Sequence, residues 1–267
     1  MFSEPPIEAD LARALERGEL LLDYQPQVDA RTGRVAAVEA LLRWRHPRRG
    51  LISPAVFIPA AERTGLIVPI GDWVLSEACR QSRRWLDAGL APVRMAVNLS
   101  ARQFSDDRLA RRVEEALDGA GLEPPDLELE ITESMMARDP DAAARIVRAL
   151  RASGVRLMID DFGTGYSSLA SLKRFPVDGL KLDRAFVQHL PHDRYDATIT
   201  RAVVDIARDL RLDLVAEGVE TDDQRLFLAD LGCGLLQGYL TGRPQSPERL
   251  ADLLQPSRLR DCARPTK

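Results

Sequence analysis

Cysteine is scarce in this chain of 267 residues, and its placement limits the chemistry that it can contribute. Cys79, Cys233 and Cys262 lie far apart, and no two of them form a Cys-x-x-Cys pair. A disulfide framework or a thiolate zinc site needs a larger and more closely spaced set, so the sequence argues against both. The same scarcity suits a reducing compartment. We expect a cytoplasmic location, either for the whole protein or for the cytoplasmic part of a membrane-anchored parent.

Long hydrophobic runs are also missing. The longest candidate, residues 66–75, is interrupted by Pro69, Gly71 and Asp72, whereas a helix that spans a bilayer needs about 20 apolar residues in succession. The amino terminus has none of the features of a signal peptide. We therefore expect no membrane segment in this chain, and sensor or regulatory domains on a longer parent protein stay open.

The chain has no excess of positive charge, and lysine in particular is rare. The formal net charge is −4, which argues against the binding of a polymeric nucleic acid. A small anionic substrate stays possible where a metal ion or nearby arginines neutralise it. Of the 37 basic residues, only Lys173, Lys181 and Lys267 are lysines. A lysine inside an apolar strand, such as Lys181, is therefore informative, because arginine and lysine differ chemically.

The hydrophobic pattern alternates between extended and helical segments. Residues 20–28 and 35–44 flank a short turn that ends in Gly33, which predicts an antiparallel hairpin. Helical segments separate the later strands, so the sequence predicts a modified (β/α)8 TIM-like barrel with one antiparallel strand. An open doubly wound sheet is the alternative. We expect one domain over residues 1–255 and a polar C-terminal tail over residues 256–267.

The predicted elements cover most of the chain. The strands are expected at residues 20–28, 35–44, 95–98, 127–132, 156–160, 179–182, 213–217 and 235–239. Helices are expected at 7–17, 54–63, 66–88, 102–119, 140–152, 221–230 and near 247–254. A further helix is expected to begin at about residue 166, and helical segments are expected between the strand at 179–182 and about residue 211. His46 precedes Pro47 and is expected in a loop, while His189 and His192 are expected to be exposed.

Two adjacent carboxylates, Asp160 and Asp161, follow a short apolar segment. Like charges repel, so such a pair needs a cation or solvent. For an isolated pair, a solvated turn that caps the next helix is the simpler interpretation. Asp161-Phe162-Gly163 also matches the metal motif of protein kinases, but the chain lacks the glycine-rich and catalytic loops that accompany that motif. The nearby glycines do not complete a dinucleotide-binding fingerprint either.

Polar residues stand at the ends of most predicted strands. Any one of them could be a surface residue or a helix N-cap, and Glu130 could belong to a strand with one solvated face. In a barrel, however, the carboxyl ends of the strands meet on one face. Oxygen ligands favour hard cations such as Mg²⁺ or Mn²⁺ over zinc, and paired ions are typical of phosphoryl chemistry. The set comprises Glu39, Asn98, Glu130, Asp160, Asp161, Lys181, Glu217 and Gln237.

Short motifs run in order along almost the whole chain. They are Tyr24-Gln25-Pro26, Glu39-Ala40-Leu41 with Arg43, Asn98-Leu99-Ser100, Glu130-Ile131-Thr132-Glu133, residues 160–169, Leu180-Lys181-Leu182-Asp183, Glu217-Gly218-Val219-Glu220 and Gln237-Gly238-Tyr239. Together they resemble the motifs of the EAL domains, the cyclic di-GMP phosphodiesterases, and are far more specific than any one alone. The resemblance implies a modified barrel with one antiparallel strand, as the opening hairpin predicts.

The resemblance also implies a role for each matched residue. It implies two ions, Mg²⁺ or Mn²⁺, one held by Glu39, Asn98, Glu130 and Asp160 and the other by Asp160, Asp161 and Glu217. Lys181 would position or help deprotonate the attacking water, Glu217 would assist as base, and Gln237 would support the water or the metals. Gln25 and Arg43 would contact substrate, with Arg43 on a phosphate. Glu133 and Glu220 would stabilise the loop after Asp160.

The resemblance implies a metal-dependent hydrolase that opens cyclic di-GMP to linear 5′-pGpG and lowers this second messenger in bacterial signalling, and the intact residue set favours activity. Two other functions stay open. A binding module would sense the dinucleotide without cutting it and would need only the groove, and a scaffold would merely pair with a regulatory domain. The resemblance further implies a homodimer.

Overall fold

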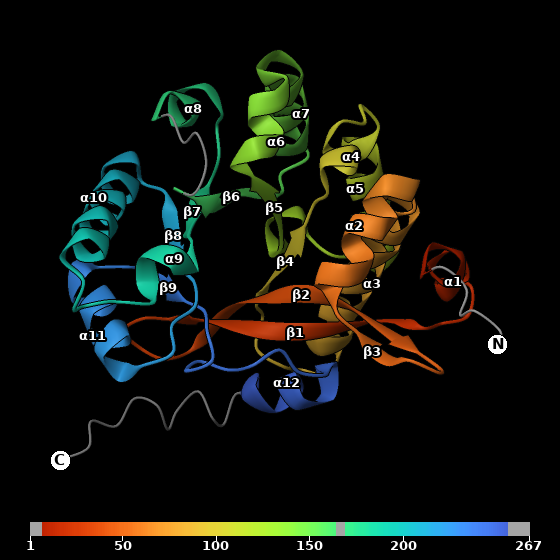
Figure 1. The fold of residues 1–267 in the computed structure, drawn as a ribbon, viewed down its shortest axis with the longest axis horizontal. Coiled ribbons are helices and arrows are strands. Elements are labelled where there is room, and N and C mark those ends of the chain that lie inside the picture. The colour runs from red at the N-terminus through yellow and green to blue at the C-terminus, as the bar shows by residue number, and fades with distance from the viewer. Residues whose placement is uncertain (1–6, 164–168, 256–267) are drawn as a thin grey trace, which may run out of the picture.

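The protein forms a closed barrel in a computed structural model that describes residues 7–163 and 169–255 (Figure 1). Its sheet runs in the order β1-β9-β8-β7-β6-β5-β4-β2-β3, and pairing of β1 with β2 closes the ring. The strands are β1 (Leu20–Asp29), β2 (Val35–His46), β3 (Gly50–Ile52), β4 (Arg94–Asn98), β5 (Leu127–Thr132), β6 (Arg156–Phe162), β7 (Gly179–Leu182), β8 (Asp213–Ala216) and β9 (Leu235–Leu236).

One barrel strand is reversed. β1 pairs antiparallel with both β2 and β9, whereas the pairs from β2 through β4 to β9 around the barrel are parallel. This confirms the predicted modified barrel with one antiparallel strand. The alternative of an open doubly wound sheet is wrong, because β1 joins the two ends of the sheet. β3 is an extra strand that pairs with β2 outside the ring and was not predicted.

Helices surround the barrel strands (Figure 1). They are α1 (Ile7–Ala14), α2 (Pro54–Thr64), α3 (Ile67–Asp87), α4 (Ala101–Phe104), α5 (Leu109–Ala120), α6 (Glu133–Arg138), α7 (Pro140–Ala152), α8 (Leu169–Arg174), α9 (Arg184–Val187), α10 (Arg194–Leu210), α11 (Asp222–Leu231) and α12 (Pro247–Leu253). The predicted helix 102–119 is in fact two helices, and α6 was not predicted. Residues 164–168 and the predicted tail 256–267 lie outside the described residues.

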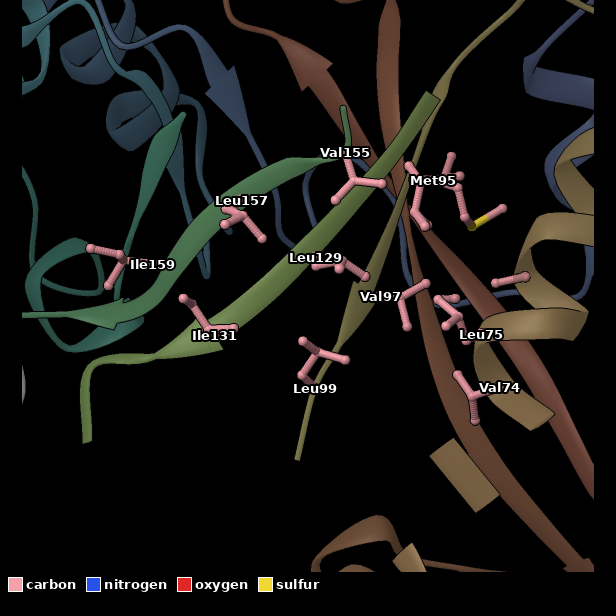
Figure 2. Close-up of a cluster of buried hydrophobic side chains, with 14 of the residues drawn as sticks. Val74, Leu75, Met95, Val97, Leu99, Leu129, Ile131, Val155, Leu157 and Ile159 are labelled. Carbon is pink, nitrogen blue, oxygen red and sulfur yellow. The ribbon is translucent and has the colours of Figure 1, made fainter. Parts of the chain in front are cut away.

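The strands alternate between an outer apolar face and a largely polar inner face. Figure 2 shows the outer face of β4, β5 and β6, where Val97, Leu129 and Leu157 belong to the hydrophobic core and Val97 lies nearest to Val74 and Leu75 of α3. Val97, Leu129 and Leu157 are each at most 1% exposed. Since successive side chains of a strand point to opposite faces, the intervening Asn98, Glu130 and Asp160 point to the inside of the barrel.

The structure corrects one prediction about a polar residue on a strand and excludes one alternative. His46 is the last residue of β2 and not a loop residue. It is buried, with Nε2 3.2 Å from Asp10 Oδ2 on α1, and its Nδ1 accepts hydrogen bonds from the backbone amides of Arg48 and Arg49. Glu130 does not lie on a solvated face, because it is 1% exposed. His189 and His192 are exposed, as predicted.

Candidate active site

Most of the predicted strand-end residues lie at or directly after the carboxyl ends of successive barrel strands, whereas Glu39 lies within β2, in the segment that pairs with β4. Glu39 is on β2, Asn98 ends β4, and Glu130 is on β5. The remaining members are Asp160 and Asp161 on β6, Lys181 on β7, Glu217 directly after β8 and Gln237 directly after β9. Parallel pairing brings these ends to one face, as the barrel geometry requires.

Lys181 is the centre of this group. It is 1% exposed, and its Nζ lies 2.8 Å from Glu130 Oε2 and 2.7 Å from Glu217 Oε1. Asp160 Oδ1 is 3.3 Å from the same ammonium and Glu39 Oε2 is 3.7 Å from it. Buried ammonium groups are costly unless they are paired. One lysine therefore partly compensates four carboxylates, and the local charge stays negative.

A network of amides fixes the orientation of Glu39. Asn98 Nδ2 donates to Glu39 Oε1 at 2.6 Å, and Gln237 Nε2 donates to Glu39 Oε2. Gln237 also donates to Gln25 Oε1 at 3.2 Å and accepts from Gln27 Nε2 at 3.0 Å. Gln27 is fully buried and was not among the predicted residues. Its alternation with Gln25 on a strand that lines the barrel is the signal that could have identified it.

Three carboxylates gather beside Lys181. Asp160, Asp161 and Glu217 each offer an oxygen within 4.8 Å of the others. Asp161 has φ 53°, which is left-handed for a residue other than glycine, and such conformations are often held at functional sites. The carboxyl group of Asp183, which caps α9, lies beside Asp161. Asp183 was part of a quoted motif, but no role was predicted for it.

The pKa values in this cluster reflect crowded negative charge. Burial, together with Asp160 and Glu39, raises the pKa of Glu217 to about 7, although Lys181 acts in the opposite direction. Burial and the neighbouring carboxylates Asp160 and Asp183 raise the pKa of Asp161 to about 6. Burial and Glu39 likewise hold the pKa of Glu130 well above its ordinary value. The positive charge near these carboxylates is therefore too small for all of them to ionise freely at neutral pH.

For Glu39 and Lys181, the surroundings favour the charged form of the side chain. Burial opposes ionisation of Glu39, but the Lys181 ammonium and hydrogen bonds from Gln237 and Asn98 bring the pKa of Glu39 below its ordinary value. Burial also opposes the charge of Lys181, but the surrounding carboxylates, led by Glu130, raise its pKa well above the ordinary value. Lys181 is therefore a cation at physiological pH in this arrangement.

The residues present fit divalent cations. All available donors are oxygens, which suit Mg²⁺ and Mn²⁺. Among the described residues, Glu130 Oε1 is buried without a hydrogen-bond partner. Three further carboxylates stand close together, and a cation between them would lower each of their raised pKa values. The predicted ligands are thus brought to one place, with Asn98 and Gln237 attached through Glu39.

The predicted substrate residues border two cavities. Gln25 lines a cavity of about 270 Å³ together with Glu39, Asp160, Lys181 and Glu217. Arg43 lines a second cavity of about 320 Å³ that also includes Asn98, one of the predicted ligands. Arg43 Nε is held by Asp23 Oδ2 at 2.9 Å. Gln25 Nε2 donates to the carbonyl of Gly242 at 3.0 Å.

The two predicted loop-stabilising residues lie in different surroundings. Glu133 is buried as the first residue of α6. Glu220 is exposed, and its Oε1 lies 3.0 Å from Arg184 Nη2 on α9. Most of the glycine turn that they are expected to stabilise, residues 164–168, lies outside the described residues, so this role stays a prediction for both.

The closed barrel and the carboxylate cluster at its carboxyl rim define a barrel domain with a candidate site for a metal ion. The chain matches the EAL domain family over residues 8–244 and belongs to that family. It is 56% identical over 241 residues to the bifunctional diguanylate cyclase/cyclic di-GMP phosphodiesterase MucR of Pseudomonas aeruginosa, covering 90% of this chain and 35% of MucR. It is 40% identical over 238 residues to the cyclic di-GMP phosphodiesterase PdeR of Escherichia coli K12, covering 89% of this chain and 36% of PdeR.

Solved structures of EAL domains superpose closely on this barrel. The P. aeruginosa MucR phosphodiesterase in complex with c-di-GMP has a TM-score of 0.87 at 56% identity, covering 91% of this chain and 98% of that one. The EAL enzyme Bd1971 with cAMP and cyclic-di-GMP bound has a TM-score of 0.88 at 31% identity, covering 93% of this chain and 68% of that one. The chain spans about a third of the length of the curated relatives that it matches.

Proposed function

We propose that this chain is a metal-dependent phosphodiesterase that hydrolyses cyclic di-GMP to linear 5′-pGpG. The observation that carries the proposal is the surplus of carboxylates around a single buried ammonium, with Asp160, Asp161 and Glu217 gathered beside Lys181. Family membership and the activity named for MucR and PdeR support the same substrate.

The proposed ion sites use every predicted ligand. Glu39, Asn98, Glu130 and Asp160 would hold one ion, and Asp160, Asp161 and Glu217 would hold the second, either Mg²⁺ or Mn²⁺. When bound, paired ions of this kind supply a nucleophile at neutral pH and offset the charge that develops on phosphoryl oxygens. The protein provides the oxygen donors and the buried cavity that holds them in place.

The other residues act on water and substrate. Lys181 is a cation among the carboxylates, so it orients the attacking water and balances charge. Glu217, whose Oε1 lies 2.7 Å from the Lys181 ammonium, receives a proton from that water. Gln237 keeps Glu39 in position through their hydrogen bond. Gln25 and Arg43 contact the dinucleotide from the two adjoining cavities, with Arg43 turning from Asp23 toward a phosphate.

The energetics of the site favour an enzyme over a scaffold. Burying several partly unpaired carboxylates lowers the stability of the fold. A domain that only pairs with a partner protein would gain nothing in return for this cost. A module that binds cyclic di-GMP without cutting it would need the cavities but not the complete carboxylate set. The presence of every predicted ligand around Lys181 therefore supports hydrolysis over binding alone.

Three wider features belong to the same proposal. We infer a homodimer, sensor or regulatory domains on a longer parent protein, and a cytoplasmic location. The second is supported by the length of the curated relatives, of which this chain spans about a third. Among the described residues, none of the helices has the length and apolar character that crossing a bilayer requires.

The proposed function is tested by product analysis. The purified protein is incubated with cyclic di-GMP in Mg²⁺, in Mn²⁺ and in EDTA, and the nucleotides are separated by chromatography. We expect linear pGpG in the presence of either ion and none in EDTA. Binding of cyclic di-GMP by calorimetry without any product under all metal conditions would instead identify a binding module.

A further inference from the structure

Gln224 is a buried residue at the start of α11. Its side chain forms four hydrogen bonds, two to each of two separate segments of the chain. Its side chain is 4% exposed. Oε1 accepts from the backbone amides of Glu220 at 2.7 Å and Thr221 at 3.0 Å. Nε2 donates to the carbonyls of Val187 at 3.2 Å and Gln188 at 3.1 Å. A capping box at a helix start accounts for the bond from Thr221 N but not for the bond from Glu220 N or for the two bonds to Val187 and Gln188.

The first segment is the loop that carries Glu217. On its other side this loop is already attached to the chain that follows β9, because Val219 N donates to Gln237 O at 3.0 Å and Leu240 N donates to Val219 O at 3.0 Å. A Cβ atom at Gly238 would overlap the backbone of Val219, so the two chains are in close contact. The loop is thus secured toward β9. Glu217 N also donates to Leu182 O at the end of β7 at 3.0 Å, and Gln224 adds a second link on that side, to α9.

The second segment is α9, which adjoins the aspartate pair. Asp183 caps α9 by accepting from Ala185 N at 2.7 Å, and its carboxyl group lies beside that of Asp161. The ion pair between Arg184 and Glu220 also links this helix to the loop, but its side chains are 56% and 40% exposed. Exposed pairs contribute little. The buried amide of Gln224 is therefore the stronger link between the loop and α9.

We propose that Gln224 is a positioning residue that sets the spacing between Glu217 and the Asp160–Asp161 pair, and thereby the affinity of this site for a divalent cation. The inference rests on the proposed cation site. Residues that orient metal ligands without touching the metal commonly change its affinity by roughly 10–100-fold. Gln224 itself contacts backbone groups and not the cation cluster.

Two substitutions separate the bonds of Gln224. Gln224→Met keeps the length of the side chain and removes all four hydrogen bonds. Gln224→Glu keeps the acceptor for Glu220 N and Thr221 N but removes both donations to α9. Asp193→Ala is the matched control, because Asp193 caps α10 through two backbone amides at 2.7 and 3.0 Å and lies outside the proposed site.

Mn²⁺ binding to the purified protein is measured by calorimetry and by the loss of the free Mn²⁺ spin resonance signal, without nucleotide. We expect Gln224→Met and Gln224→Glu to bind Mn²⁺ at least about tenfold more weakly than the parent. Asp193→Ala should bind like the parent even though its melting temperature falls.

Parent-like Mn²⁺ affinity in folded Gln224→Glu would overturn the positioning role while leaving the cation site intact. A parent protein that binds no Mn²⁺ would overturn the proposed cation site as well. The Glu variant keeps its capping bonds, so it supplies the answer if Gln224→Met does not fold.

Discussion

Replacing Lys181 by methionine should destabilise the metal-free protein strongly, and the loss should depend on pH. The ammonium lies within 3.7 Å of four carboxylates and is 1% exposed. Removing one member of a buried charge pair typically costs about 3–5 kcal/mol, because the remaining charge stays buried and uncompensated. Since whole domains are stable by only about 5–15 kcal/mol, this is a large fraction of the total.

Protonation of the neighbouring carboxylates and binding of a metal ion should each reduce the loss of stability in Lys181→Met. The pKa of Glu217 is about 7, so at pH 6 this carboxylate already takes up a proton, and the cost of Lys181→Met should be smaller than at pH 8. Without the competing ammonium, a divalent cation should stabilise the variant more than the parent. A ligand at 100 times its dissociation constant contributes about 2.7 kcal/mol.

The assay is urea unfolding at pH 6 and pH 8, with EDTA and with Mg²⁺, alongside turnover of cyclic di-GMP. Lys173→Met is the matched control, since Lys173 is exposed on α8 and its loss should change stability by no more than about 0.5 kcal/mol. Lys181→Arg retains the charge but not the compact ammonium, and we expect it to be inactive. The reasoning is refuted if Lys181→Met matches the parent at pH 8 in EDTA, or if the arginine variant turns over normally.

Further predictions concern the carboxylates. Asp160→Asn should keep the fold but lower turnover by about 10³-fold, corresponding to several kcal/mol of transition-state stabilisation; parent-like hydrolysis would contradict the two-ion proposal. The raised pKa of Glu217 means that the folded metal-free protein retains a proton that the unfolded chain releases from about pH 4.5 upward. Stability in EDTA should therefore fall by up to roughly 3 kcal/mol between pH 4.5 and 7, and Mg²⁺ should abolish this slope in urea titrations. Glu133→Ala should raise the Mg²⁺ concentration needed for half-maximal activity, and an unchanged midpoint would exclude the loop-stabilising role. The parent should sediment as a homodimer, and a fully active monomer would disprove that assignment.

Much of the barrel follows from local pattern in the sequence. The alternation of apolar and polar residues in Leu127–Thr132 identifies a strand and assigns Glu130 to one face. The short turn before Val35 predicts the antiparallel pairing that β1 and β2 show. Short irregular elements were harder to predict. The break between α4 and α5 arises at Ser105 and Asp106, where the Asp106 carboxylate accepts from Arg108 N in a local turn that has no strong glycine or proline signal.

The positions of polar residues relative to distant parts of the chain could not be obtained in this way. His46 looks like a loop residue because Pro47 follows it, yet its ring meets Asp10, 36 positions earlier in the chain. Gln224 looks like an ordinary capping residue, and its bonds to Val187 and Gln188 arise only where α9 and α11 pack together. Both partnerships join segments that are distant in the sequence and meet only in the tertiary structure.

The sequence by itself determined which residues stand at the strand ends, that they offer oxygen to a hard cation, and that Lys181 is unusual among them. These conclusions depend on side-chain chemistry and on the two-residue period of a strand, both of which are local. Only the tertiary structure decided that one ammonium lies among four carboxylates, that Glu217 has a pKa near 7 while Glu39 stays readily ionised, and that Gln224 links the Glu217 loop to α9. Burial and the distances between charges govern those properties, and both arise when the strands close into a barrel.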